Sequence, residues 1–203
     1  MTITLHKGDL PASFEPAPIV ALDTETLGLN PLRDKLCLIQ ISNGDGDAHL
    51  VQFDRSSYDA PNLVKMLSDP KITKLFHFAR FDVAVLAHYL NVSLTPVYCT
   101  KIASKLVRTY TDRHGLKDLC KELINVDLSK QQQSSDWGAD DLSPAQQEYA
   151  ASDVLYLHAL KEKLDDMLTR EDRAGIAQEC FDFLPTRTRL DLSGWAEQDI
   201  FAH

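Results

Sequence analysis

The chain has 203 residues, of which 44% are hydrophobic and 25% charged, an ordinary globular composition that argues against intrinsic disorder. Its formal net charge of −9 at pH 7 argues against a protein that wraps long nucleic acids on a basic surface. No apolar run approaches the roughly 18 residues of a membrane-spanning helix and the N-terminus has no signal pattern, so we expect one cytoplasmic domain over residues 1–203.

The first half of the chain reads mainly as strands. We predict strands, in chain order, at residues 19–24, 35–42, 48–53 and 72–78. The turn-forming sequence NGDGD at 43–47 predicts a hairpin between the second and third of them. A short helix over 61–68 precedes the fourth.

The second half reads mainly as helices. We predict them, in chain order, at residues 79–90, 100–109, 115–124 and 144–167. Ser143 is a suitable N-cap for the last helix, and Pro144 suits its first position. Strands followed by interleaved helices indicate an α/β fold with a mixed sheet covered by helices.

The last stretch, about residues 180–203, is rich in apolar side chains, among them Phe181, Leu184, Trp195 and Phe201. Apolar side chains in such number must be covered. We expect this tail to dock on its own domain or on a neighbouring subunit.

Two carboxylates one residue apart, Asp23 and Glu25, end the apolar run of the first strand. Residues i and i+2 of a strand point to the same face, so the two charges lie together. Such a pair at the end of a buried strand repels itself and loses hydration, which makes a purely structural role hard to explain.

Further acidic and phenolic groups come from two predicted helices. Asp82 lies in the first turn of helix 79–90, where the helix dipole alone would favour it. Tyr149 and Asp153 are four residues apart and share one helix face, although Tyr149 could be packing and Asp153 an ordinary surface charge.

Electrostatics indicates how such a set of carboxylates could coexist. Two carboxylates about 4–5 Å apart repel by roughly 3–4 kcal/mol at an effective dielectric near 20. Divalent cations remove this penalty, and hard oxygen ligands suit Mg²⁺ or Mn²⁺. Two such ions about 3.5–4 Å apart could clamp the reacting oxygens of a phosphodiester.

Three motifs in this order resemble the exonuclease motifs of the DEDD superfamily of 3′→5′ exonucleases, tyrosine subtype. They are DTE at 23–25, HFARFD at 77–82 and YAASD at 149–153. The stretch SDWGADDLSPAQQEYAASDVLYL at 135–157 is similar to ribonuclease D. The chain resembles the alphaproteobacterial nanoRNase C group still more closely. This resemblance rests on its short length and on two stretches, KIASKLVRTYTDRHGLKDL at 101–119 and FLPTRTRLDLSGW at 183–195.

The resemblance implies a ribonuclease H-like exonuclease fold, with a mixed five-stranded sheet flanked by helices and no additional nucleic-acid-binding domain. It implies two Mg²⁺ or Mn²⁺ ions, with Asp23 bridging them, Glu25 and Asp153 completing the site that binds the nucleophilic water, and Asp82 holding the second ion. Tyr149 would orient or help deprotonate that water.

Residues next to the motifs are candidates for binding the substrate. The backbone of Thr26 and Leu27 could meet the terminal ribose, and Leu27 or Leu29 could wedge between the last two bases, unless Leu29 merely covers the core. His77 either contacts the substrate or is a hydrogen-bonded structural histidine. Six Lys and Arg residues lie between Lys101 and Lys121, either as a solvated helix face or as a phosphate-binding patch.

We therefore expect a 3′→5′ exoribonuclease that degrades short oligonucleotides, dinucleotides included, to nucleoside 5′-monophosphates, with DNA ends as a further substrate. The alternative enzyme is a ribonuclease D that trims the 3′ ends of structured RNA such as tRNA. A catalytically dead RNA-binding module is a third class, which the intact acidic set opposes. The resemblance also implies a homo-oligomer, a ring-shaped octamer.

Overall fold

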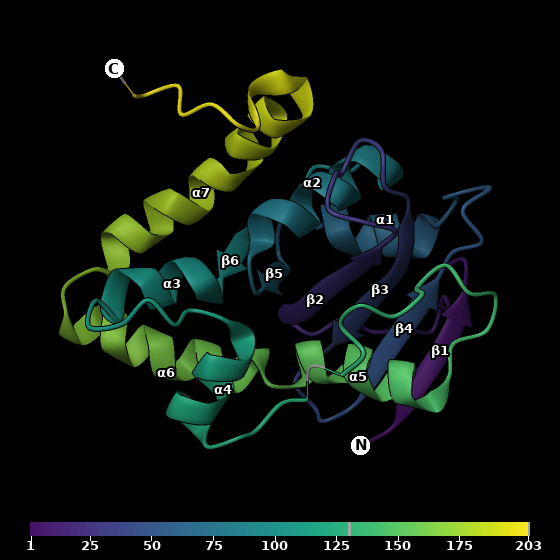
Figure 1. Ribbon diagram of the computed structural model, residues 1–203, viewed down its shortest axis with the longest axis horizontal. Helices are drawn as coiled ribbons and strands as arrows, with labels where there is room; N and C mark the ends of the chain where they lie inside the picture. Colours follow the sequence, from purple (N-terminus) through teal and green to yellow (C-terminus); the bar gives the residue numbers. More distant parts are fainter. Residues whose placement is uncertain (130, 203) are drawn as a thin grey trace.

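The computed structural model describes residues 1–129 and 131–202, so His203 of the apolar tail lies outside the described residues. A single mixed sheet with strand order β1-β4-β3-β2-β5-β6 forms its centre (Figure 1). The strands are β1 (Ile3–Lys7), β2 (Ile19–Thr26), β3 (Leu36–Ser42), β4 (Ala48–Gln52), β5 (Thr73–Phe76) and β6 (Val97–Cys99). β3 is antiparallel to both β2 and β4, and the other neighbouring pairs are parallel.

The expected mixed sheet is confirmed, but in the described part of the chain it has six strands instead of five. The sequence prediction did not locate the two edge strands, β1 and β6. β1 has five residues and β6 only three, which is too short for a clear alternation of apolar and polar side chains. Both depend on parallel pairing with distant segments, β1 with β4 and β6 with β5.

Helices flank the sheet on both sides; Figure 1 shows α1 and α2 on one side and α5 on the other. They are α1 (Pro61–Ser68), α2 (Ala79–Leu90), α3 (Thr100–Val107), α4 (Leu116–Ile124), α5 (Pro144–Leu155), α6 (Leu157–Arg170) and α7 (Ala174–Leu190). Two hydrophobic clusters fill the layers, and Ile39 and Val51 lie in one while Leu38 and Leu50 lie in the other. The middle strands are therefore buried on both faces, which holds β2 rigidly.

The predicted helix over 144–167 is wrong in one respect, because it is two helices that meet at Tyr156. Its start is confirmed: Ser143 accepts from the Gln146 amide, and the Gln146 side chain accepts from the Ser143 amide, a complete capping box. No proline or glycine marks the break. α5 packs across β3 and β4, whereas α6 packs against α3 and α4, so tertiary packing sets the change of direction.

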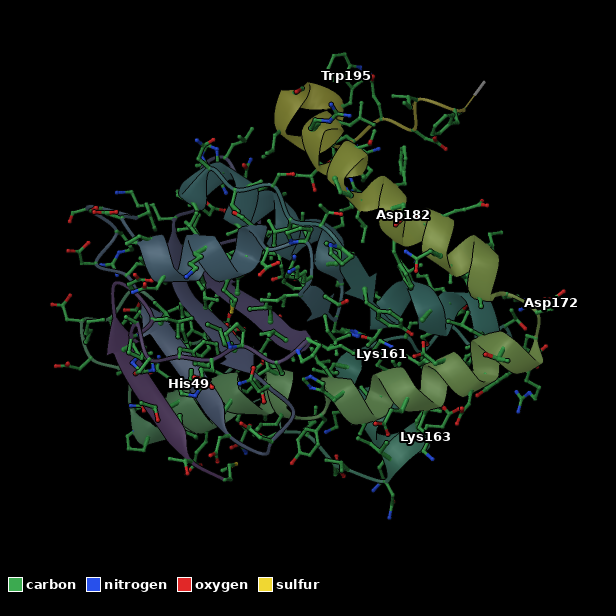
Figure 2. All side chains as sticks on the ribbon, turned by 180° about the vertical axis from the view of Figure 1, so that it is seen from behind. His49, Lys161, Lys163, Asp172, Asp182 and Trp195 are labelled. Carbon is green, nitrogen blue, oxygen red and sulfur yellow. The ribbon has the colours of Figure 1, made fainter. Side chains whose placement is uncertain are left out.

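The apolar tail forms a helix and a final turn. α7 buries Phe181 and Leu184 and is followed by a π-type turn, Asp191–Trp195, in which Gly194 has φ 99°. Trp195 lies at the outer end of this element (Figure 2) and is 44% exposed, while Phe201 is 72% exposed. The tail therefore docks partly on its own domain. None of the helices in the described part of the chain combines the length and the apolar character that a membrane span requires.

Candidate active site

β2 carries Asp23 and Glu25 on the face of the sheet that α5 covers. Their partners across the antiparallel pair are Gln40 and Leu38, and Leu38 lies in the hydrophobic cluster beneath α5. The preceding residues of β2, from Val20 to Leu22, are fully buried. The strand regularity breaks between Glu25 and Thr26, where the chain leaves the sheet. The two carboxylates are thus fixed at the end of a central strand.

Two helices bring the other acidic groups to the same place. Asp153, on α5, completes a set in which one oxygen each of Asp23, Glu25 and Asp153 lie within 4.8 Å of one another. Asp82 is buried in the first turn of α2 and accepts a hydrogen bond of 2.6 Å from the Thr24 hydroxyl. Thr24 points to the opposite face from its two acidic neighbours. The Asp82 carboxylate is therefore held by a residue on the face of β2 opposite to that of Asp23 and Glu25.

Burial raises the pKa values of all four carboxyls, and repulsion by neighbouring carboxyls adds to the rise for Asp23, Glu25 and Asp82. The pKa of Glu25 rises to about 9 through burial and then through Asp153 and Asp82. Burial raises the pKa of Asp153 to about 7 against a hydrogen bond from the Tyr149 phenol. That of Asp82 also rises to about 7, against the hydrogen bond from Thr24. Asp23 shifts in the same direction, through burial and then Asp82, Asp153 and Glu25.

A divalent cation fits this site. Four converging carboxyls that resist ionisation together would ionise readily around Mg²⁺ or Mn²⁺, which prefer such hard oxygen ligands. The pKa of Tyr149 is also raised, first by burial and then by Asp153, so the phenol keeps its proton near neutral pH. Tyr149 is thus a hydrogen-bond donor beside the carboxylates.

The acidic group lies in a cleft of about 700 Å³. The cleft is lined by all nine residues that the sequence singled out, namely Asp23, Glu25, Thr26, Leu27, Leu29, His77, Asp82, Tyr149 and Asp153. Leu27 is 52% exposed and Leu29 is 87% exposed. A leucine so exposed does not cover the core, so the structural alternative for Leu29 is excluded.

His77 lies at the cleft but is engaged by the protein. Its Nδ1 is 2.8 Å from the Thr100 hydroxyl, which in turn donates to the Phe76 carbonyl. Burial, and then the charge of Lys101, lower the pKa of His77 to about 3, so the imidazole is neutral. His77 is therefore a hydrogen-bonded residue of the cleft wall.

The structure also sorts the basic stretch between Lys101 and Lys121. Only Lys101 and Lys117 of the predicted basic residues line the cleft. Arg108 is fully buried and pairs with Glu122, and Lys121 lies 3.7 Å from Asp127. Most of this stretch is thus structural or solvated. Lys101 and Lys117 face the cleft, and Lys117 also lies 3.4 Å from Asp127.

Phe78 lines the same cleft, although the sequence pattern assigned it no role. It is 47% exposed and occupies the left-handed region at φ 65°, which is uncommon for a bulky residue. The Lys101 ammonium lies 4.1 Å from the centre of its ring, within cation–π range. No sequence signal identifies such a backbone conformation in advance.

Trp137 forms another wall that the motifs did not reveal. It is 4% exposed, and its ring centre lies 6.0 Å from that of Tyr149. The next residue, Gly138, lies so close to Leu27 that a Cβ would come within 2.9 Å of Leu27 Cδ2. The pair Trp137–Gly138 thus contacts both Tyr149 and Leu27. In the sequence, the only indication of this wall was a tryptophan followed by a glycine within a polar loop.

Replacing Trp137 by leucine should lower kcat by about tenfold or more, because Tyr149 loses its packing partner. Trp137→Phe keeps an aromatic ring and should retain most activity. In a Tyr149→Phe background, Trp137→Leu should add little further loss, as residues that act as one unit are not additive. Steady-state kinetics on a dinucleotide with Mn²⁺ checks this. A full loss in both backgrounds would show that Trp137 acts independently of Tyr149.

The comparisons with known proteins agree with this geometry. Residues 9–169 match the family model described as 3′-5′ exonuclease. Ribonuclease D of Acidiphilium cryptum is 31% identical over 163 residues, which are 80% of this chain and 41% of that protein. The chain thus spans about two fifths of the length of the ribonuclease D relatives that it matches.

Solved structures show the same relationship. Brucella melitensis NrnC with bound Mg²⁺ is 60% identical, with a TM-score of 0.96 and 100% of both chains covered, and the same protein was also solved bound to pGG. Escherichia coli RNase D is 27% identical with a TM-score of 0.75, over 85% of this chain and 45% of that one. These matches confirm the ribonuclease H-like exonuclease fold. The chain therefore belongs to the 3′–5′ exonuclease family, as a DEDD-type nuclease that resembles ribonuclease D and, over its whole length, NrnC.

Proposed function

We propose that the protein is a metal-dependent 3′→5′ exoribonuclease that degrades short oligonucleotides, dinucleotides included, to nucleoside 5′-monophosphates. The observation that carries this is the group of carboxylate oxygens from Asp23, Glu25 and Asp153, within 4.8 Å of one another in the cleft. The volume of the cleft, about 700 Å³, is that of a small-ligand site. The binding of pGG by NrnC, 61% identical to this chain, supports a short substrate.

The carboxylates of Asp23, Glu25, Asp82 and Asp153 would hold two Mg²⁺ or Mn²⁺ ions. Bound there, the ions supply a more acidic water and neutralise charge on the phosphodiester. Tyr149 donates to Asp153 and orients the attacking water from the α5 side. Attack on phosphorus breaks the bond to the 3′ oxygen of the penultimate nucleotide, which leaves as a 3′-hydroxyl after taking up a proton.

The remaining cleft residues would position the last two nucleotides. Thr26 and Leu27 meet the terminal ribose, Leu29 separates the bases, and His77 forms part of the wall. Phe78 offers a stacking surface that accepts any base. Lys101 and Lys117 face the phosphates, while the net charge of −9 disfavours long nucleic acids.

Leu29→Ala should raise KM for a dinucleotide about tenfold without lowering the melting temperature. The side chain is 87% exposed, so its removal costs no packing, whereas loss of a base contact weakens binding. Leu32→Ala is the matched control, since Leu32 lies in the same loop and is 48% exposed but does not line the cleft. Equal effects of the two variants would contradict the assignment of Leu29.

The substrate class is tested by comparing kcat/KM for a 5′-phosphorylated dinucleotide, RNA and DNA strands of up to about twenty nucleotides, and a tRNA precursor. We expect the dinucleotide to be the best substrate. The ribonuclease D relatives support the alternative, trimming of structured RNA, and preference for the precursor would establish it instead.

We also propose a homo-oligomer, a ring-shaped octamer, in which neighbouring subunits cover the exposed apolar side chains of the C-terminal region. Ile176, Phe183, Trp195, Ile200 and Phe201 are all at least 38% exposed. Phe183 and Phe201 also line an apolar hollow of about 620 Å³ between α3 and α7. Mass photometry should give an octamer, and a monomer at micromolar concentration would refute this part.

A further inference from the structure

The C-terminal element lies outside the residues that match the exonuclease family model, yet it is attached to a catalytic motif. The family match ends at residue 169, before α7 begins at Ala174. α7 packs along α2, the helix that carries Asp82, and α2 contacts α7 more extensively than it contacts any strand. The turn after α7, Asp191–Trp195, also contacts α2.

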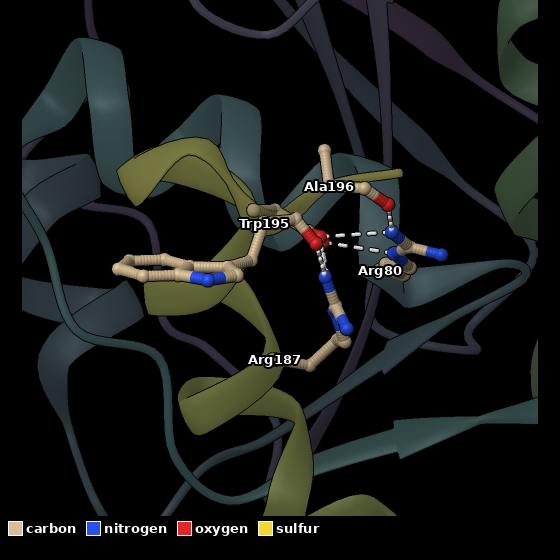
Figure 3. A network of polar contacts seen from close by, with 5 residues as sticks. Arg80, Arg187, Trp195 and Ala196 are labelled. Atoms are coloured by element: carbon tan, nitrogen blue, oxygen red, sulfur yellow. Dashed lines mark hydrogen bonds and ion pairs between the residues drawn. The ribbon is translucent and has the colours of Figure 1, made fainter. Parts of the chain in front are cut away.

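One buried carboxylate makes this attachment. Asp191 is 7% exposed and accepts two hydrogen bonds from Arg80, both of 2.8 Å (Figure 3). Arg187 donates to the same carboxylate over 2.6 and 2.9 Å. Each guanidinium also donates from Nη2 to a backbone carbonyl of the turn, Arg80 to Ala196 at 2.7 Å and Arg187 to Trp195 at 2.5 Å.

Arg80 connects this network to the active site. It lies two residues before Asp82 in the first turn of α2, so the two side chains point in nearly opposite directions. Asp82 faces the cleft while Arg80 faces the C-terminal turn. The residue that precedes the helix, Phe78, has φ 65°, so the helix starts from an unfavourable backbone conformation that its surroundings must hold.

We propose that the C-terminal turn is a positioning element for Asp82, acting through Arg80 and Asp191. Bidentate arginine–carboxylate pairs fix orientation as well as distance. The pair ties the first turn of α2 to α7 from outside, while the Thr24 hydroxyl holds the Asp82 carboxylate from inside. This inference rests on the proposed metal-dependent function, because Asp82 acts there as a ligand.

Mn²⁺ binding to the full-length protein tests the proposal, with calorimetry as the readout. Asp191→Asn keeps the size of the side chain and removes its charge, and we expect about tenfold weaker binding at the site that Asp82→Asn also weakens. Arg80→Met should give the same loss, and the double variant Arg80→Met/Asp191→Asn should be no worse than either single one. Hydrogen exchange at amides 79–84 should rise in each variant.

Asp165→Asn is the matched control, because Asp165 also joins two elements, accepting from Tyr98 and Lys161, but does not line the cleft. Its Mn²⁺ binding should equal that of the wild type. Unchanged binding in folded Asp191→Asn, or an equal loss in Asp165→Asn, would overturn the positioning role. If Asp191→Asn does not fold, Arg80→Lys decides, since it keeps a single ion pair and should show an intermediate loss. Failure of the wild-type protein to bind Mn²⁺ would instead refute the proposed function.

Discussion

Replacing Asp23 by asparagine should abolish metal-dependent exonuclease activity and at the same time stabilise the metal-free protein. Activity should fall by about a thousandfold or more, since Asp23 belongs to the carboxylate group that we propose as the metal site. Without metal, the Asp23 carboxyl either stays protonated or repels the carboxylates beside it, and each close pair of charges costs roughly 3–4 kcal/mol at an effective dielectric near 20. Removal of this ionisable group should therefore raise the melting temperature in EDTA at about pH 8.

The control for this experiment is Asp166→Asn, because Asp166 is an exposed residue of α6. It should change neither activity nor stability measurably. Calorimetric unfolding with EDTA and with Mn²⁺ distinguishes the outcomes: wild type should gain stability from Mn²⁺, and Asp23→Asn should gain little. Retained activity of Asp23→Asn in the presence of Mg²⁺ or Mn²⁺ would refute the metal site. A lower melting temperature of this variant in EDTA would refute the electrostatic explanation.

The stability of the metal-free protein should fall as the pH rises from about 6 to about 8.5. Folding raises the pKa of Glu25 to about 9 and those of Asp82 and Asp153 to about 7. The folded state therefore holds protons that the unfolded chain has released above about pH 4, so the free energy of unfolding declines through this window. At about 1.4 kcal/mol per proton and pH unit, these three shifts give a decline on the order of 6 kcal/mol.

Saturating Mg²⁺ or Mn²⁺ should abolish this decline, so stabilisation by the metal grows with pH and metal binding releases protons. Urea unfolding across the pH range with metal or EDTA measures both effects. At acid pH, His77 has the opposite effect on the free energy of unfolding. Folding lowers the pKa of His77 to about 3, so the unfolded chain binds a proton that the folded state does not, and stability falls as the pH drops below about 6.5. Metal stabilisation that weakens at higher pH would contradict the raised carboxyl pKa values.

Local signals located most of the elements well. The helix predicted over 61–68 matches α1, and the capping residues Ser143 and Pro144 mark the start of α5. The turn sequence at 43–47 does join β3 to β4, with Gly44 and Gly46 at positive φ. These features succeeded because the interactions that form them lie within a few residues along the chain.

Features that depend on distant segments were not predicted. The end of α5 at Tyr156, the two edge strands and the helix that runs through Pro185 all arise from packing against elements far away in the sequence. In the active site, Phe78 and Trp137 line the cleft because a backbone conformation and a long loop place them there. The Arg80–Asp191 pair joins residues 111 positions apart.

The grouping of the acidic and phenolic side chains follows from residue spacing alone. Period-two spacing places Asp23 and Glu25 on one face of a strand, and a spacing of four places Tyr149 and Asp153 on one face of a helix, whatever the rest of the fold. Tertiary packing, in contrast, sets which lysines face the cleft, which aromatic rings form its walls, and the contact between the C-terminal turn and the helix of Asp82. The physical reason is that side-chain direction follows from local backbone geometry, whereas contacts between elements follow from how the whole core packs.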